Sequence, residues 1–188
     1  MAAEHIALDA DGIARIVRRV ASEIVERTRG THKLGLIGIR RGGVPIATRI
    51  AAEIQRAEGR VVPTGAIDIT LYRDDAAVAL PDPKIGPSEI DFTIEGWDVV
   101  LVDDVLHTGR TVRAAIDHLL DYGRPRRIWL AALCDRGGRE LPIAPDFVGR
   151  AFEVPEGAVL DVLADGGPGD RALIRPAGSV ATPARGGP

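Results

Sequence analysis

The stretch Val99-Val-Leu-Val-Asp-Asp-Val-Leu-His-Thr-Gly-Arg-Thr111 is the part of the sequence that decides the fold. Its apolar beginning predicts a buried strand. The chain from Thr111 to Tyr122 then has the pattern of a helix, which Gly123 ends. We therefore expect a strand to about residue 102, a loop over residues 103–109 and a helix, in that order.

Residues 107–111 have the features of a phosphate cradle. A helix start offers unpaired N–H groups and the positive end of the helix dipole. Thr108 and Thr111 add hydroxyl donors, while Gly109 lets a ligand approach the backbone closely. We therefore expect an anionic phosphate group to bind at this helix start.

Asp103 and Asp104 come shortly before this cradle and call for a different ligand group. Carboxylates repel a phosphate, but they accept hydrogen bonds from hydroxyl groups. A ribose 5-phosphate meets both needs, with its phosphate on residues 107–111 and its 2′- and 3′-hydroxyls on the two acids. The same carboxylates would stabilise positive charge at C1 if a leaving group departs through an oxocarbenium-like state.

Other interpretations of these residues are open at this point. An Asp-Asp pair after a strand also forms magnesium sites in receiver domains, and it can cap a helix. Thr-Gly before a helix is common in loops. Three motifs are missing, because the chain contains no Walker phosphate loop, no Asp-x-Asp phosphatase spacing at Asp103 and no Gly-x-Gly-x-x-Gly after a strand.

The rest of the sequence alternates helical and strand patterns. Apolar residues of the segment 9–29 recur at helical spacing, and Val44-Pro45 begins a second amphipathic stretch. Strands with helices between them, and without polar alternation, predict a mainly parallel sheet covered on both faces, so the expected fold class is α/β. The other expected strands lie at residues 34–39, within 60–71, at 128–134, and in shorter pieces at 146–148 and 158–163.

Length and composition limit the domain organisation and the function. The 188 residues fit one domain, which we place at residues 1–164. The segment 165–188 is rich in Gly, Pro and Ala, so we expect a largely flexible tail.

No apolar run is long enough for a membrane span and the first residues lack a secretory signal, which predicts a cytoplasmic protein. The net charge of −3 argues against coating nucleic acid by bulk electrostatics, and the lone Cys134 is expected to be a buried hydrophobe.

The quoted stretch closely resembles the signature of type I phosphoribosyltransferases. Three further segments, Asp68 to Asp75, Gly123 to Pro125 and Asp135 to Pro142, are similar to the pyrimidine operon regulator (PyrR) family. The resemblance implies a parallel sheet flanked by helices, with a mobile flap and a small hood. It also implies uracil phosphoribosyltransferase activity, in which uracil and 5-phosphoribosyl-1-pyrophosphate (PRPP) give UMP and pyrophosphate.

The resemblance assigns roles to residues outside the quoted stretch. Arg40 and Arg41 fall where such enzymes bind the pyrophosphate, although two arginines in a solvated turn would look the same. Tyr72 and Arg73 match the mobile flap, which closes over the donor and protects a reactive cationic intermediate from water.

The nucleobase is expected to contact Asp135 and Arg136, unless these form a plain surface ion pair, and the chain near Val159 would complete that pocket. Magnesium is expected to arrive on the pyrophosphate oxygens of PRPP, without direct protein ligands. The expected catalytic residues are Asp103, Asp104 and Arg41. The full set expected to bind substrate is Arg40, Arg41, Tyr72, Arg73, Asp103, Asp104, Val105, Leu106, His107, Thr108, Gly109, Arg110, Thr111, Asp135, Arg136 and Val159.

RNA binding is the second role that the resemblance implies. UMP bound in the active site would favour a state that binds the leader mRNA of pyrimidine genes. A solvated helix face is the other interpretation of the arginines in the first helix. The family often carries His-Arg where this chain has Gly138-Arg139, so one RNA contact is missing. The residues expected to contact RNA are Arg15, Arg18, Arg19 and Arg139.

Two alternatives to this double role are open. The first is a purely RNA-binding regulator of transcription or translation with vestigial catalysis, and the second is a phosphoribosyltransferase for another base. The family commonly forms dimers or larger assemblies, so a homo-oligomer is expected in either case.

Overall fold

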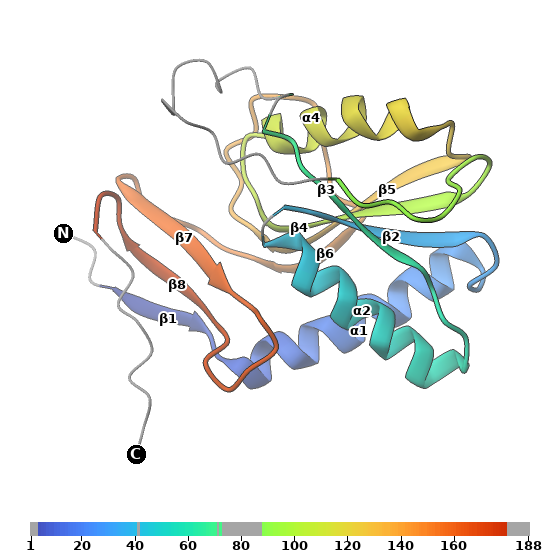
Figure 1. Cartoon of the computed structure of the whole chain (residues 1–188). Helices are drawn as coiled ribbons and strands as arrows, with labels where there is room; N and C mark the ends of the chain where they lie inside the picture. The colour runs from blue at the N-terminus through green and yellow to red at the C-terminus, as the bar shows by residue number, and fades with distance from the viewer. Residues whose placement is uncertain (1–3, 41, 71, 73–87, 180–188) are drawn as a thin grey trace.

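The computed structural model describes residues 4–40, 42–70, 72 and 88–179, and its centre is a parallel sheet (Figure 1). Within these ranges the sheet has five strands in the order β3-β2-β4-β5-β6. All neighbouring pairs run parallel, which confirms the α/β class. The strands are β2 (Leu34–Ile39), β3 (Thr64–Ile67), β4 (Asp98–Leu106), β5 (Arg127–Asp135) and β6 (Phe147–Ala151).

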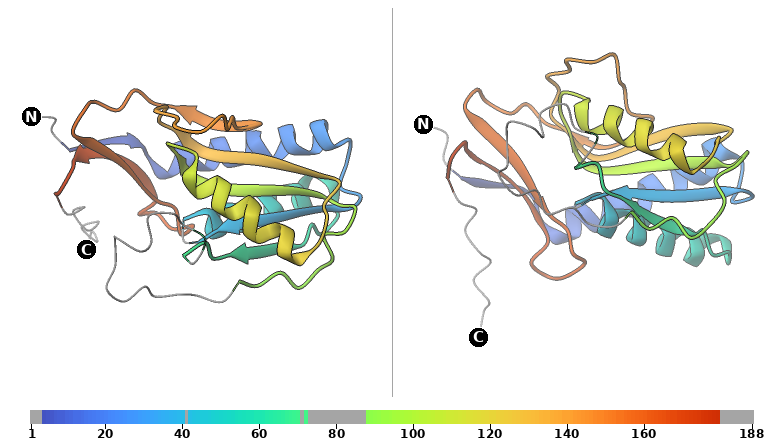
Figure 2. Two further views of the ribbon diagram at one scale, coloured as in Figure 1. Left: turned by 90° about the horizontal axis from the view of Figure 1, so that it is seen from above. Right: turned by 45° about the horizontal axis from the view of Figure 1, so that its top comes forward.

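Helices cover both faces of this sheet (Figure 2). On one face lie α1 (Ala10–Thr28) and α2 (Gly43–Glu58). On the other lies α4 (Arg110–Leu119), which is followed by the 3-10 turn η1 (Leu120–Tyr122). β2 is buried along its whole length, so its sequence shows no polar alternation.

α1 begins and ends at residues that suit its termini. The Asp9 side chain accepts a hydrogen bond from Gly12 N at 2.7 Å, which satisfies one of the free N–H groups of the first turn. At the other end Arg29 is left-handed with φ 57°, and its N–H donates to carbonyls of the last turn. The predicted segment 9–29 therefore matches the helix to within a residue at each end.

β4 is longer than its sequence indicated, because it continues to Leu106 instead of ending at residue 102. Its extra residues find partners on β5, where Asp103 pairs with Ala132 and Leu106 with Asp135. The prediction that a loop begins at Asp103 was therefore wrong. Asp103 and Asp104 are strand residues, and successive side chains of a strand point to opposite faces of the sheet.

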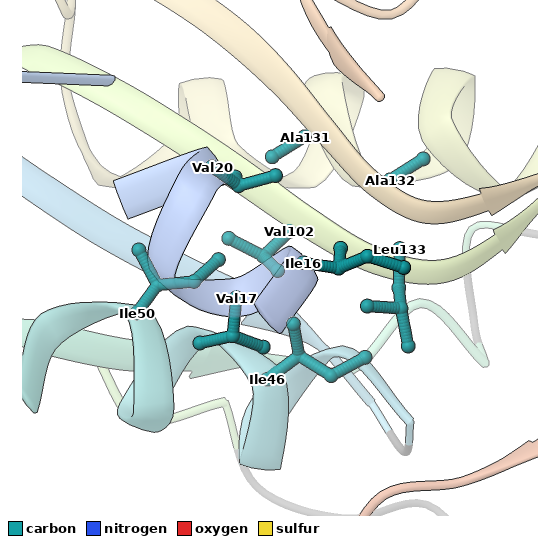
Figure 3. A pocket seen from close by; sticks show the side chains of 9 residues that line it. All are labelled: Ile16, Val17, Val20, Ile46, Ile50, Val102, Ala131, Ala132 and Leu133. Atoms are coloured by element: carbon teal, nitrogen blue, oxygen red, sulfur yellow. The ribbon is translucent and has the colours of Figure 1, made fainter. Parts of the chain in front are cut away.

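A small apolar cavity lies in the core between α1, α2 and the sheet (Figure 3). Its volume is about 10 Å³, which is roughly the space of one water molecule. Since the side chains around it are aliphatic, a water there would find no polar partner. The cavity is a packing gap and not a candidate site. Its lining residues are Ile16, Val17, Val20, Ile46, Ile50, Val102, Ala131, Ala132 and Leu133.

A second, antiparallel sheet forms a hood beside the first. It contains β1 (His5–Leu8), β7 (Ala158–Leu163) and β8 (Arg171–Pro176) in the order β1-β8-β7. Apolar residues of β7 and β8 join the buried cluster of α1 and α2. Asp170, just before β8, forms an ion pair of 2.6 Å with Arg49 of α2, which tethers the hood to the helical layer.

The expectation of a largely flexible tail from residue 165 was wrong for β8. Ala172, Leu173 and Ile174 are buried, and β8 is the central strand of the hood. The composition of the segment 165–188, averaged over its length, hides this short apolar run. The domain therefore includes at least residues 171–176, and not only residues 1–164 as predicted.

In the part of the chain that the structure describes, no helix has the length and apolar character needed to span a membrane.

Candidate functional site

A pocket of about 300 Å³ lies where β4 ends and α4 begins. It brings Asp103 together with the predicted phosphate cradle. It also contains Glu140, which was not among the predicted site residues. Parallel strands place their carboxyl ends at one edge of a sheet, so a pocket at this edge was expected. The residues that line it are Asp103, Val105, Leu106, His107, Thr108, Gly109, Arg110, Thr111 and Glu140.

The cradle is built around Gly109, the residue that caps α4. Gly109 has φ 92°, a left-handed conformation that a residue with a Cβ rarely adopts, and its added Cβ would also lie 3.3 Å from Ile143 Cβ. A glycine cap has no side chain to accept hydrogen bonds from the first turn. The Thr108 hydroxyl accepts one from Arg110 N at 3.3 Å. The helix start thus presents backbone N–H groups and the positive dipole end to the pocket.

The two acids of β4 occupy different environments. Asp103 is buried and lines the pocket, and its Oδ1 accepts a hydrogen bond from Asp104 N at 3.0 Å. Burial, together with the negative charge of Asp104, raises the pKa of Asp103 well above its usual range. Asp104 points toward the start of α2, where an added Cβ on Gly42 would lie 2.0 Å from Asp104 Oδ2.

The predicted pyrophosphate loop lies on the same edge of the sheet. Arg40 directly follows β2, and its guanidinium forms an ion pair of 3.3 Å with Glu89. Arg41 lies outside the described residues. Because Asp104 contacts the Gly42 turn, this loop and the pocket of β4 are neighbours, separated by the Asp104 carboxylate.

Tyr72 does not join the pocket. Its ring lies 4.2 Å from the ring of His118, and its hydroxyl donates to Asp121, which raises the pKa of Tyr72. Both partners lie at the C-terminal end of α4 and in η1, whereas the cradle is at the N-terminal end of α4. Arg73, the other predicted flap residue, lies outside the described residues.

The residues expected to contact the base come together after β5. Arg136 N donates to Leu106 O at 3.1 Å, and the Arg136 guanidinium donates to Ala158 O at 3.2 Å, next to Val159. The Asp135 carboxylate accepts from Arg139 at 2.7 Å. Partial burial raises the pKa of Asp135, but the hydrogen bonds from Arg139 and Gly137 N outweigh it and lower the pKa below its usual value.

Arg139 is occupied by contacts within the protein. Besides Asp135, its guanidinium donates to His107 O at 2.9 Å and to Ile143 O at 3.1 Å, so it fastens the segment after β5 to the cradle. The sequence predicted an RNA contact for Arg139 and did not indicate this structural role. The sequence signal for this contact is an aspartate and an arginine four residues apart, Asp135 and Arg139, with two glycines between them.

His107 is part of the contact between the cradle and the segment after β5. Partial burial and the neighbouring Arg136 charge lower the pKa of His107, so its imidazole is mostly neutral at neutral pH. A Cβ on Gly138 would lie 2.8 Å from His107 Nε2, so the ring lies against this glycine. His107 therefore shapes the wall of the cradle.

The comparisons with known proteins agree with this geometry. The model of the phosphoribosyl transferase domain family matches residues 7–159, so the chain has the fold of a phosphoribosyltransferase domain. Proteins named "Bifunctional protein PyrR" are similar to most of the chain. That of Pelotomaculum thermopropionicum is 56% identical over 76% of this chain and 79% of its own length. That of Geobacter sulfurreducens is 53% identical over 80% of this chain and 85% of its own length. The chain belongs to the PyrR family.

Solved structures support the fold independently. The hypoxanthine phosphoribosyltransferase of Trypanosoma cruzi superposes with a TM-score of 0.67 at 19% identity, over 93% of this chain and 98% of that one. A hypoxanthine-guanine phosphoribosyltransferase of Bacillus anthracis gives a TM-score of 0.65 at 19% identity, over 81% and 86% of the two chains. At this identity the likeness concerns the fold alone, and it confirms the type I phosphoribosyltransferase fold that the sequence motif implied.

Proposed function

We propose that the protein transfers the 5-phosphoribosyl group of PRPP to N1 of uracil, giving UMP and pyrophosphate, and that it regulates pyrimidine genes by binding their leader mRNA in response to UMP. The observation that carries the first half is one pocket that combines the helix start at residues 107–111 with the Asp103 carboxyl group. Membership of the PyrR family supports both halves.

In this proposal each part of the site binds a different part of the donor. The N–H groups at the start of α4 and the Thr108 and Thr111 hydroxyls hold the 5-phosphate. Asp103 and Asp104 accept hydrogen bonds from the ribose hydroxyls. As the bond from C1 to pyrophosphate lengthens, the Asp104 carboxylate stabilises the positive charge that develops on the sugar.

Pyrophosphate leaves toward the loop after β2. There the Arg40 guanidinium and the neighbouring Arg41 would bind its oxygens. Among the described residues, no cluster of three or more His, Cys, Asp or Glu side chains is arranged to hold a metal ion. Magnesium would arrive on the pyrophosphate of the donor, where it would supply positive charge to the leaving group.

The base site is the segment after β5. The backbone around Asp135 and Arg136 would supply hydrogen bonds to the edge of uracil, next to the chain at Val159. Arg136 N already donates to Leu106 O of β4. The base and the phosphate are therefore held by two loops that are joined to each other.

For RNA, the edge strand β6 is better suited than the outer groove between α1 and α2. Arg19 of α1 donates to Val148 O at 3.0 Å, and the Arg27 guanidinium lies 5.3 Å from the Trp129 ring centroid and 5.6 Å from that of Phe147. These contacts hold two positive charges beside β6, where they attract a phosphate backbone. Arg18 instead lines a groove with three glutamates, which would repel a phosphate backbone: Glu26, Glu53 and Glu58.

The transferase is tested by incubating the protein with uracil, PRPP and Mg²⁺ and measuring UMP by chromatography. Asp104→Asn serves as the control, since it removes a charge that the reaction needs while the volume stays the same. Orotate and hypoxanthine are run beside uracil. Turnover of one of these bases, and none of uracil, contradicts the assignment.

The regulatory role is tested by filter binding to the leader RNA of pyrimidine genes, with and without UMP. We expect UMP to strengthen binding, and Arg19→Ala to weaken it more than Arg18→Ala does. Equal binding to a scrambled RNA would remove the regulatory role and leave the transferase standing.

A further inference from the structure

Glu140 is an acidic residue in a pocket that suits an anion. It lines the pocket together with residues 107–111, and its Oε2 lies 2.7 Å from Arg110 Nε. The proposed reaction explains Asp103, which faces the ribose hydroxyls, but it gives Glu140 no ligand. A carboxylate next to a bound phosphate raises the energy of the complex, because like charges repel at short distance.

The backbone fixes Glu140 at this place. Glu140 N and Leu141 N both donate to Thr108 O, at 3.0 Å and 3.2 Å. The Arg139 guanidinium adds its hydrogen bond to His107 O. The chain at residue 140 therefore cannot move away from the cradle unless the cradle moves too. The Glu140 side chain is paired with Arg110, but because it is 53% exposed it can turn toward solvent without moving the backbone.

Stability does not explain the ion pair. Arg110 and Glu140 have side chains that are 46% and 53% exposed, and exposed ion pairs contribute little to folding. The Glu140 charge affects ligand binding more than it affects folding. The N–H groups of the cradle and the Arg110 guanidinium surround a single site, and the Glu140 carboxylate lies beside that site. A negative charge there acts on each anionic ligand that enters.

We propose that Glu140 competes with the phosphate of the ligand for Arg110. In the empty pocket the Glu140 carboxylate pairs with Arg110. When a phosphate monoester binds, this carboxylate is either displaced from Arg110 or remains beside the phosphate as a repelling charge. This inference rests on the proposed function, in which the cradle holds the 5-phosphate of PRPP and UMP. Glu140 is then a residue that sets affinity and specificity. It weakens the binding of phosphorylated ligands and so promotes the release of UMP.

The test uses Glu140→Gln, which keeps the length of the side chain and a hydrogen bond to Arg110 but removes the charge. Calorimetric titration of the full-length protein with UMP should give a dissociation constant about 3- to 10-fold lower than that of the wild type, the size expected when one partly exposed repulsion is removed. Uridine, which lacks the phosphate, should bind equally to both. The gain for UMP should shrink as salt screens the charge.

Asp117→Asn is the matched control. Asp117 forms an ion pair of 2.7 Å with Arg113 on the same helix, with side chains 52% and 38% exposed, and it does not line the pocket. The control removes one negative charge and one exposed ion pair, so its UMP affinity should equal that of the wild type. An equal gain in this variant would mean that net charge alone is responsible, and it would overturn the inference.

The remaining outcomes are also decisive. If Glu140→Gln binds UMP as tightly as the wild type or more weakly, Glu140 is a support for Arg110 and the inference fails while the transferase proposal stands. If the wild type binds no UMP and makes none from uracil, both proposals fail together. Circular dichroism of each variant confirms that the fold is intact.

Discussion

The Asp104 carboxylate occupies the space that a side chain at Gly42 would need. A Cβ on Gly42 would lie 2.0 Å from Asp104 Oδ2, 2.4 Å from its Cγ and 2.9 Å from its Cβ. The clash involves the whole Asp104 side chain, so rotation of its tip cannot relieve it. Since Gly42 has φ −69°, its backbone would accept any residue, and the need for glycine is purely one of space.

The first prediction is that Gly42→Ala displaces Asp104 and disables the reaction. Turnover should fall by roughly 10² or more, because a charge aimed at the transition state is moved. The free energy of unfolding should change by only about 1–2 kcal/mol. Steady-state kinetics and urea denaturation measure the two effects.

Gly167→Ala is the control for this prediction. Gly167 lies in the turn before β8, and the nearest atom to an added Cβ is 4.0 Å away. Its turnover should be unchanged. Full activity in Gly42→Ala would show that Asp104 can move without consequence, which would remove it from the catalytic residues.

The second prediction concerns the pH dependence of stability at Asp103. Its pKa is raised in the folded protein by burial and by Asp104, so the folded state holds the Asp103 proton more tightly than the unfolded state does. The stabilisation that results is present below the unfolded pKa and is lost as pH rises through the folded pKa. Above that pH, the buried charge costs free energy.

Asp103→Asn should therefore be more stable than the wild type at about pH 8, by roughly 1–3 kcal/mol, with a difference that shrinks toward about pH 4. Asparagine keeps the acceptor for Asp104 N. Urea denaturation at several pH values measures the difference. A variant that is less stable than the wild type at about pH 8 contradicts the raised pKa.

The third prediction is that Arg139 maintains the base site. Arg139→Ala removes hydrogen bonds to His107 O, Ile143 O and Asp135, and should cost roughly 1–3 kcal/mol of stability. KM for uracil should rise more than KM for PRPP, because the segment after β5 loses its attachment to the cradle. Arg124→Ala, an exposed arginine, serves as the control. An equal rise of both KM values would place Arg139 outside the base site.

The fourth prediction is that Cys134 does not react in the folded protein. Burial raises the pKa of its thiol to about 12, with a smaller contribution from the Asp104 charge, so thiolate is scarce at neutral pH. Ellman's reagent should label the thiol only after denaturation in guanidinium chloride. Rapid labelling of the native protein would show that the end of β5 opens easily.

The sequence predicts those parts of the fold that depend on local patterns. α1 and the helices after Gly42 and Gly109 follow from the helical spacing of their apolar residues. The buried parallel strands follow from uninterrupted apolar runs such as residues 99–102. The cradle was predictable for the same reason, because glycine, hydroxyl residues and a helix start are all contiguous.

Contacts between distant segments were not predictable from local patterns. β8 is stabilised by pairing with β1, which lies more than 150 residues earlier in the chain, and nothing in its own Gly- and Pro-rich surroundings indicates a strand. Glu140 reaches the cradle only because Thr108 O binds two N–H groups of its segment. Tyr72 was expected at the donor, whereas in this structure it stacks on His118 at the far end of α4.

The strand order of the hood has a consequence for synthesis on the ribosome. The parallel sheet is complete once residue 151 has emerged, but β1 and β7 gain their shared neighbour only when β8 follows. A nascent chain can therefore form its central layer while β1 is still unpaired, because β1 pairs only when β8 follows. A chain truncated at residue 164 would leave β1 and β7 without the strand that pairs with both, and unpaired strand edges promote aggregation.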